Sequence, residues 1–220
     1  MSEMPLEPCG PSIAPAAPLL QTTEPASHWR FDLPSLTGSL VTVREPRPDD
    51  ARALFTALST WEVARYLSPP PPSVGGFERF IEWTRQQRLA GRYAGFVVVP
   101  HGTEVAVGLF QIRALDVTFG IAEWGFALAP ECWGSGMFQD AAHLVAGFAF
   151  DTLGVRRLEA RPVAGNDRGN AALRKLGAVK EGVLRAAFVR NGEYLDQAVW
   201  SILREEWRAR ASVSRNSRPH

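Results

Sequence analysis

The strongest constraint on the fold is a strand that runs through a glycine-rich turn directly into a helix. Residues 122–137 read AEWGFALAPECWGSGM. We predict a strand over 121–128, which ends before Pro130, and a strongly apolar helix over 136–150. This arrangement places the start of a helix beside the end of a strand.

The start of this helix is a candidate anion-binding site. The first N–H groups of a helix lack intrahelical partners, and together with the helix dipole they attract negative charge. Gly134 and Gly136 would let a phosphate approach the backbone closely. A plain strand–turn–helix connection fits the turn equally well. No Lys-Ser or Lys-Thr pair follows the glycines, which disfavours a P-loop, and the lack of G-x-G-x-x-G weakens a dinucleotide-binding reading.

The rest of the chain alternates strands and helices. We predict strands over 38–44, 96–99, 104–112 and 158–161, and helices over 73–89, over 167–176 and from Asp49 or Asp50 to Leu58. The Asn191-Gly192 pair predicts a type I′ hairpin turn within 178–203. Consecutive strands favour antiparallel pairing, whereas the strand–helix–strand step from 121 to 161 favours one parallel crossover. The fold class is therefore α/β, with a mixed, mostly antiparallel central sheet flanked by helices.

Composition is that of a single globular domain. Of the 220 residues, 45% are hydrophobic and 21% are charged. Residues 1–27 are rich in Pro and Ala and lack periodicity, so we expect a disordered tail there. Residues 209–220 are polar, and we expect them to fray, which leaves 28–208 as one domain.

Charge and cysteine content exclude several classes of protein. A formal net charge of +1 gives no argument for nucleic acid or membrane as a partner. We expect neither a membrane span nor a secretory signal. Cys9 and Cys132 do not form a disulfide framework, so a cytoplasmic location is expected. The four histidines are too scattered to predict a metal site.

Two further features point to a ligand between strands. In the strand over 121–128, Glu123 shares its face with Gly125 and Ala127, a bare strip that would suit a thioester meeting an amine. An exposed acid on a solvent face explains the same pattern. Asn166 lies between a strand end and a helix start, where it caps the helix or bonds a ligand.

Combined, these segments resemble the GNAT acetyltransferases, and within them the RimJ/RimL-type protein N-acetyltransferases. The resemblance spans about residues 38–207. It implies a V-shaped split between two parallel strands, in which the pantetheine arm of CoA lies like an added strand. The segments that carry it are EWGFAL at 123–128, CWGSG at 132–136, Asn166 with Asn170, LRKLGAVKEGVLR at 173–185 and NGEYLDQAVWSILREEW at 191–207.

The resemblance also implies which residues form the site. Glu123 is implied as the general base and Asn166 as a group near the thioester. Trp133 and Phe138 depart from the family pattern, which has Arg or Gln, and Gly or Ala, at these positions. Gly169 stands where many relatives have a serine proposed to protonate the leaving thiolate. The residues implied to bind acetyl-CoA are Phe126, Ala127, Leu128, Trp133, Gly134, Ser135, Gly136, Met137, Phe138, Asn166 and Asn170.

We therefore expect an enzyme that moves an acetyl group from acetyl-CoA to a primary amine by direct transfer in a ternary complex. The expected acceptor is a protein or peptide α-amine, because its pKa of about 7.7–8.0 makes deprotonation easy for a weak base. A small-molecule acetyltransferase acting on an aminoglycoside, polyamine or amino acid stays an alternative, as does a catalytically silent acyl-CoA-binding module. A homodimer also stays open. Candidate residues on the acceptor side are Trp61, Tyr66, residues 68–73 and Phe188.

Overall fold

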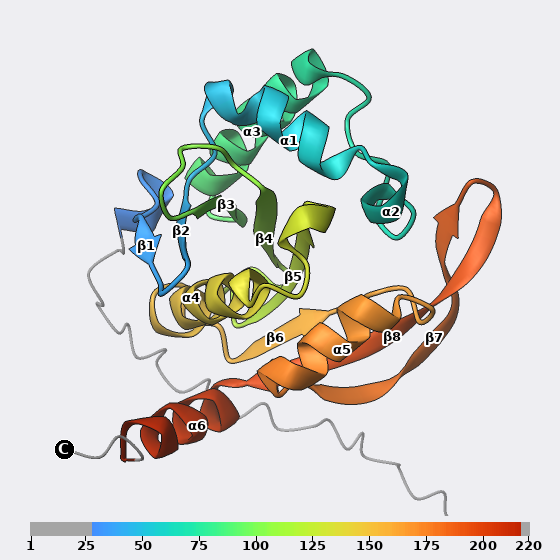
Figure 1. Cartoon of the computed structure of the whole chain (residues 1–220). Helices are drawn as coiled ribbons and strands as arrows, with labels where there is room; N and C mark the ends of the chain where they lie inside the picture. The colour runs from blue at the N-terminus through green and yellow to red at the C-terminus, as the bar shows by residue number, and fades with distance from the viewer. Residues whose placement is uncertain (1–27, 217–220) are drawn as a thin grey trace, which may run out of the picture.

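The computed structural model describes residues 28–216, of which 211–216 are described as backbone only (Figure 1). The tail predicted over 1–27 lies outside the described residues. The strands are β1 (Leu36–Thr37), β2 (Val41–Arg44), β3 (Tyr93–Pro100), β4 (Gly108–Ala114), β5 (Ile121–Leu128), β6 (Arg157–Ala160), β7 (Val179–Arg190) and β8 (Glu193–Leu203). The helices are α1 (Ala51–Leu58), α2 (Trp61–Ala64), α3 (Val74–Leu89), α4 (Met137–Asp151), α5 (Asp167–Leu176) and α6 (Arg204–Asn216), with 3-10 turns η1 (His28–Arg30), η2 (Pro48–Asp50) and η3 (Pro130–Cys132).

The strands form one mixed sheet in the order β1-β2-β3-β4-β5-β6-β8-β7. Among the described strands, β5 and β6 are the one parallel pair, as the crossover predicted. Their pairing runs from Ile121 opposite Arg157 to Glu123 opposite Glu159 and then stops. β5 continues to Leu128 along β4, while β6 ends at Ala160 along β8. The two strands therefore separate after Glu123.

Helices cover both faces of the sheet. The ring of Phe96 on β3 contacts Phe148 of α4, with centroids 5.0 Å apart. Tyr93 of the same strand contacts Trp83 of α3 at 5.2 Å. Side chains at odd and even strand positions point to opposite faces, so α3 and α4 lie on opposite sides of the sheet. The side of α4 that faces the sheet is rich in alanine, which lets the helix approach closely.

Several local predictions are confirmed. The helix predicted over 73–89 is α3, and the Ser73 hydroxyl caps it by accepting the Gly76 N–H at 3.1 Å. Asn191 and Gly192 both have positive φ, 51° and 83°, as a two-residue type I′ turn requires. The helix predicted over 167–176 is α5, and Gly177 ends it in the left-handed conformation, with φ of 87°.

Other predictions are wrong in informative ways. The single strand predicted over 38–44 is a hairpin of β1 and β2 that turns at Gly38. Asp50 occupies the predicted N-cap position of α1, but its side chain does not cap the helix, because its carboxylate accepts from Arg44 at 2.8 and 2.9 Å and from the Arg47 N–H at 2.7 Å. α6 was not predicted; it packs Trp207 against Phe150 and extends to Asn216. None of the described helices has the length and apolarity needed to cross a membrane.

The hairpin turn is anchored on the first turn of α4. The Asp140 carboxylate accepts the N–H groups of Ser39, Leu40 and Val41 at 3.0, 2.7 and 3.1 Å. Gly38 is required here, because a Cβ would collide with this carboxylate. Burial alone would raise the pKa of Asp140, but the three N–H bonds outweigh it and hold the pKa below its usual value. The contact thus fixes the start of α4 against the edge of the sheet.

Replacing Asp140 by Asn should lower the free energy of unfolding by about 2 kcal/mol, since charge-assisted hydrogen bonds contribute about 1.5–3 kcal/mol. Urea unfolding measures the loss. The folded-state pKa is depressed, so the contribution is present above the ordinary Asp pKa of about 3.9 and disappears as pH falls through the folded value. Asp151→Asn is the control, because Asp151 is 64% exposed and 3.6 Å from Arg208. Equal losses in the two variants would contradict this anchoring role.

Candidate active site

Beyond Glu123, one edge of β5 has no strand beside it. The Ala129 N–H donates to Val107 O and the Leu115 N–H to Ile121 O, so odd-numbered residues of β5 bond β4. The N–H and C=O groups of Phe126 and Leu128 consequently point toward β6, where pairing has ended. This edge is a place where an extended ligand can add as a strand.

The turn that follows β5 leaves backbone N–H groups open. Gly134 and Gly136 have φ of 75° and 89°, and Gly136 occupies the N-cap of α4 without a side-chain cap. Ser135 Oγ donates to Cys132 O at 2.7 Å and accepts the Met137 N–H at 3.3 Å. A Cβ at Gly134 would meet no atom within 4 Å, so the space beside Gly134 is open, whereas a Cβ at Gly136 would meet the Leu40 side chain at 3.3 Å. The geometry is that of an anion-binding helix start.

Among the predicted cofactor residues, the aromatic ones are partly buried and pack against the core. The rings of Phe126 and Phe138 lie 4.7 Å apart, and both contact Phe110. Trp133 is held by its indole N–H, which donates to Leu128 O at 3.0 Å. Phe126 and Phe138 stay partly exposed, so a ligand can contact either their backbone or their rings.

The two asparagines predicted in the site have structural partners. Asn166 Oδ1 caps α5 by accepting the Gly169 N–H at 3.0 Å, the simpler of its two predicted roles. Asn170 is 9% exposed, and its Nδ2 faces three carbonyl oxygens, those of Val163, Ala164 and Asn166. Its Oδ1 accepts the Trp200 indole N–H at 2.7 Å. The cofactor contact of Asn170 stays a prediction, with its amide already engaged by the protein.

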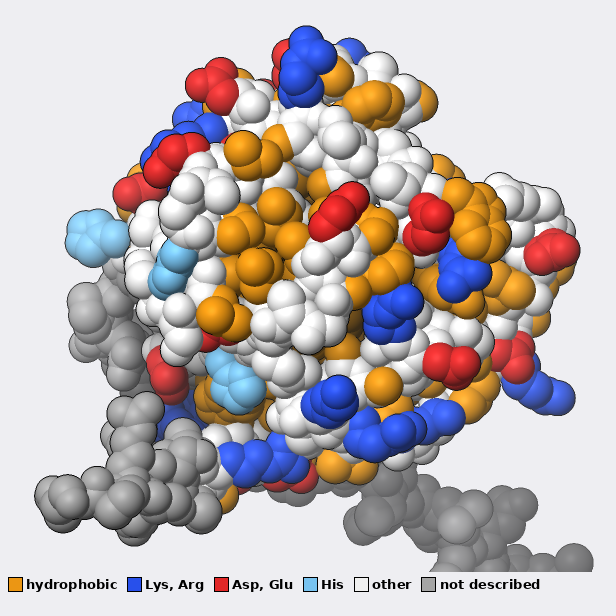
Figure 2. Space-filling view, in the orientation of Figure 1, with side chains coloured by type: hydrophobic (Ala, Val, Ile, Leu, Met, Phe, Trp, Pro, Cys, Tyr) orange, Lys and Arg blue, Asp and Glu red, His pale blue; other side chains and the backbone are white. Residues whose placement is uncertain are grey.

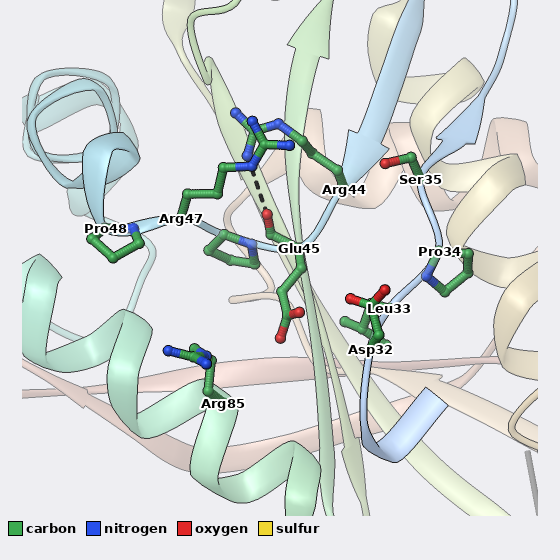
Figure 3. A pocket seen from close by; sticks show the side chains of 10 residues that line it. Asp32, Leu33, Pro34, Ser35, Arg44, Glu45, Arg47, Pro48 and Arg85 are labelled. Atoms are coloured by element: carbon green, nitrogen blue, oxygen red, sulfur yellow. Dashed lines mark hydrogen bonds between the residues drawn. The ribbon is translucent and has the colours of Figure 1, made fainter. Parts of the chain in front are cut away.

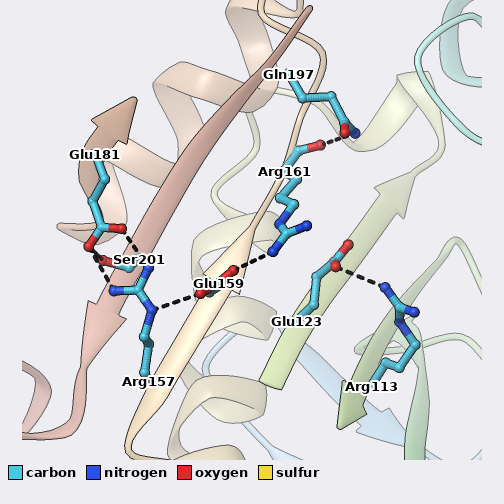
Figure 4. Close-up of polar contacts among 8 residues, drawn as sticks. All are labelled: Arg113, Glu123, Arg157, Glu159, Arg161, Glu181, Gln197 and Ser201. Carbon is cyan, nitrogen blue, oxygen red and sulfur yellow. Dashed lines mark hydrogen bonds and ion pairs between the residues drawn. The ribbon is translucent and has the colours of Figure 1, made fainter. Parts of the chain in front are cut away.

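Two glutamates, Glu123 and Glu159, are register partners at the point where β5 and β6 separate (Figure 4). Glu159 is 8% exposed and bonds Arg157 at 2.7 Å and Arg161 at 2.9 Å. Burial alone would raise the pKa of Glu159, but the two guanidinium groups outweigh it and hold the pKa below its usual value. Glu123 has one partner, Arg113 at 2.9 Å, and its side chain is 25% exposed. Glu123 is thus the carboxylate with a free side toward the opening.

The ion pairs around Glu159 were missed by the sequence reasoning. Arg157 also bonds Glu181 on β7, and Glu181 accepts the Ser201 hydroxyl from β8 at 2.7 Å. The alternation of Arg157, Glu159 and Arg161 is a period-two signal for one polar face of a strand. Its partners on β7 and β8 are distant in sequence.

Residues of α2 and the segment after it reach the loop that follows β6. The Tyr66 hydroxyl donates to Gly165 O at 3.1 Å. The Arg65 guanidinium lies over both the Trp61 and Tyr66 rings, at 4.7 and 4.5 Å from their centroids. Of the predicted acceptor-side residues, Trp61 is 69% exposed, and Tyr66 connects the segment after α2 to the loop after β6. Phe188 pairs with Leu195 in the β7–β8 hairpin.

A separate crevice of about 380 Å³ lies between the segment before β1 and the residues after β2 (Figure 3). It is lined by residues 32–35 and 44–48 with Arg85, and it contains none of the predicted site residues. The Arg44 side chain beside it is already paired with Asp50. Within residues 28–216, no group of three or more His, Cys, Asp or Glu side chains could hold a metal ion.

Comparison with known proteins identifies the family. Residues 41–179 match the family model described as "Acetyltransferase (GNAT) domain". The chain belongs to this family. The family and the fold predicted from the sequence are confirmed, and the chain is an N-acetyltransferase of the GNAT type, a family that uses acetyl-CoA.

The GNAT domain has relatives of similar length. It is 28% identical over 176 residues to the uncharacterized N-acetyltransferase YoaA of Bacillus subtilis, covering 78% of this chain and 97% of that protein. Its fold is similar to Mycobacterium smegmatis RimJ in complex with CoA-disulfide, with a TM-score of 0.71, 21% identity and coverage of 79% and 88%. It is also similar to the ribosomal-protein-S5-alanine acetyltransferase of Vibrio fischeri, with a TM-score of 0.71, 20% identity and coverage of 80% and 99%.

Cys132 lies beside the candidate phosphate turn and is a free cysteine, 8% exposed. Burial, and to a smaller degree the charge of Glu131, raises the pKa of its thiol. A protonated, buried thiol is a poor nucleophile. We therefore do not assign Cys132 a covalent role.

Incubation of the protein with acetyl-CoA should leave no acetyl group on Cys132, as measured by intact mass spectrometry followed by peptide mapping. Cys132→Ala should also leave the rate of acetyl transfer nearly unchanged, because the thiolate needed for attack is suppressed by burial. An acetylated Cys132 peptide, together with loss of activity in the variant, would establish an acyl-enzyme and contradict direct transfer.

Proposed function

We propose that this GNAT domain transfers an acetyl group from acetyl-CoA directly to the α-amine of a protein or peptide. The observation that carries the proposal is the position of Glu123. It occupies the last paired position before β5 and β6 separate, and its carboxylate shares a face with Gly125 and Ala127. A base at this position lies where a thioester in the split would end.

In this proposal the cofactor is bound mainly through backbone groups. The pantetheine arm adds to the free edge of β5, where it pairs with the C=O of Phe126 and leaves the Phe126 N–H for the thioester. The diphosphate lies over the turn from Trp133 to Phe138, whose glycines and free N–H groups suit an anion. The Leu128 carbonyl is already bonded to Trp133, so Phe126 is the main pairing residue.

The Phe126 N–H also supplies the electrophilic assistance. Among the backbone groups of 126–128, those of Ala127 face β4, so its N–H is used in the sheet. A donor fixed by the sheet costs little reorganisation as the thioester oxygen gains charge. We assign this stabilisation of the tetrahedral intermediate to Phe126.

Glu123 removes the proton that the attacking amine loses, directly or through one water. An α-amine with a pKa of about 7.7–8.0 is roughly 10–20% neutral at pH 7, whereas a lysine amine with a pKa near 10.4 is only about 0.04% neutral. The CoA thiol resembles a cysteine thiol, with a pKa of about 8.5, and can leave as a thiolate. No general acid is then needed at Gly169, where a Cβ would press against the Asn166 side chain.

Two observations support a peptide or protein acceptor. The segment around α2 exposes Trp61 and bonds the loop after β6 through Tyr66. In this proposal these aromatic side chains form an open surface on which a peptide can bind. That segment, 61–76, contains one acidic residue, Glu62, which is unfavourable for a polycationic small molecule. Two proteins of similar fold are named RimJ and ribosomal-protein-S5-alanine acetyltransferase.

Glu123→Gln should lower kcat/KM at neutral pH by about 10²- to 10⁴-fold, the usual range for removal of a general base. The deficit should narrow as pH approaches the pKa of the acceptor, because the amine then arrives neutral. For an α-amine it should nearly vanish by about pH 8–9, and for lysine only above about pH 10. CoA release from a panel of peptides and small amines measures both the acceptor class and the profile.

Glu78→Gln is the matched control, since Glu78 is an exposed acid on α3. It should keep the wild-type profile. If Glu123→Gln also keeps wild-type activity across neutral pH, Glu123 is a surface acid and the proposed mechanism is wrong.

A further inference from the structure

The turn assigned to the diphosphate carries no positive side chain of its own. Residues 130–140 read PECWGSGMFQD, without Lys or Arg and with two acids, Glu131 and Asp140. The Asp140 carboxylate is engaged by the N–H groups of the β1–β2 turn. A diphosphate at this turn would meet backbone donors, and any guanidinium or ammonium must come from another element.

The structure brings one such group to the turn from the opposite side of the split. Arg168 lies in the first turn of α5, and its guanidinium carbon is 3.4 Å from the centre of the Trp133 ring. Trp133 is itself fixed by the bond from its indole N–H to Leu128 O. This stack joins the element after β6 to the turn after β5.

The N–H donors of the Arg168 guanidinium are available to a ligand. Arg168 is exposed, and none of the ion pairs among the described residues includes it. Stacking uses the flat face of a guanidinium and leaves its edge N–H donors free for two parallel bonds to phosphate oxygens. On the face that shows α4 and α5, Lys and Arg side chains gather over α5, beside an apolar centre (Figure 2).

We propose that Arg168, stacked on Trp133, is the residue that binds the CoA diphosphate, with Trp133 as the platform that aims it. The inference rests on the proposed function, since it places CoA in the split. In this proposal α5 supplies the positive charge that α4 lacks. The indole of Trp133 occupies the turn because it holds that charge in place. Because the pair spans the split, CoA binding also ties its two sides together.

The test is titration calorimetry of the full-length protein with CoA, dephospho-CoA and pantetheine. Arg168→Gln should weaken CoA binding about 10- to 100-fold, as expected for loss of charge-assisted bonds. Dephospho-CoA, which lacks only the 3′-phosphate, should lose the same factor, whereas pantetheine should bind both proteins equally. A loss that disappears with dephospho-CoA would move Arg168 to the 3′-phosphate and overturn the diphosphate assignment.

Further variants test whether Trp133 orients the Arg168 guanidinium or only packs beside it. Trp133→Leu should cause a similar loss, and adding it to Arg168→Gln should cost little more, because the two residues act as one unit. Arg79→Gln on α3 removes an exposed arginine away from the split and should bind CoA like the wild type. Additive losses from Trp133 and Arg168 would contradict the platform role.

The outcomes also distinguish this inference from the proposed function. If the wild type binds CoA and Arg168→Gln binds it equally well, with unchanged melting temperature, this inference is wrong while the proposed function stands. If the wild type fails to bind CoA at all, both are wrong.

Discussion

The early end of the β5–β6 pairing is the constraint on which the rest of the structure depends. After Glu123, β5 stays bonded to β4 and β6 stays bonded to β8, so each strand follows its own half of the sheet. The backbone groups exposed by this separation would be costly if left unpaired in a dry interior. An open edge of this kind is tolerated where solvent or a ligand can satisfy it.

Contacts between distant segments hold the two halves in place around this opening. Tyr66 bonds the loop after β6 on one side, and Trp133 stacks with Arg168 on the other. Asp140 fixes the start of α4 to the β1–β2 turn, which sets where the helix dipole points. The chemistry proposed for Glu123 depends on this framework, because general base catalysis requires a carboxylate within hydrogen-bond reach of the amine or its bridging water.

The elements predicted well from the sequence are those determined by local signals. β5 and α5 have the predicted bounds, since Asn166 and Gly177 are strong start and stop signals and the strand alternates cleanly. The backbone part of the candidate site follows from the same strand–turn–helix motif. What the sequence could not reveal depends on distant partners: the hairpin at Gly38 is held by Asp140, and Arg168 meets Trp133 across the split. Such contacts leave no periodic pattern.

The central claim is that acetyl-CoA adds to the free edge of β5 and to the turn before α4. Amide hydrogen exchange, followed by mass spectrometry with and without saturating acetyl-CoA, tests it most directly. The account predicts that early exchange slows most in peptides covering 124–128 and 134–139, with a smaller change in 93–100 of the core. Slowing centred on the crevice residues 32–48, or no slowing at 124–128 and 134–139, would contradict it.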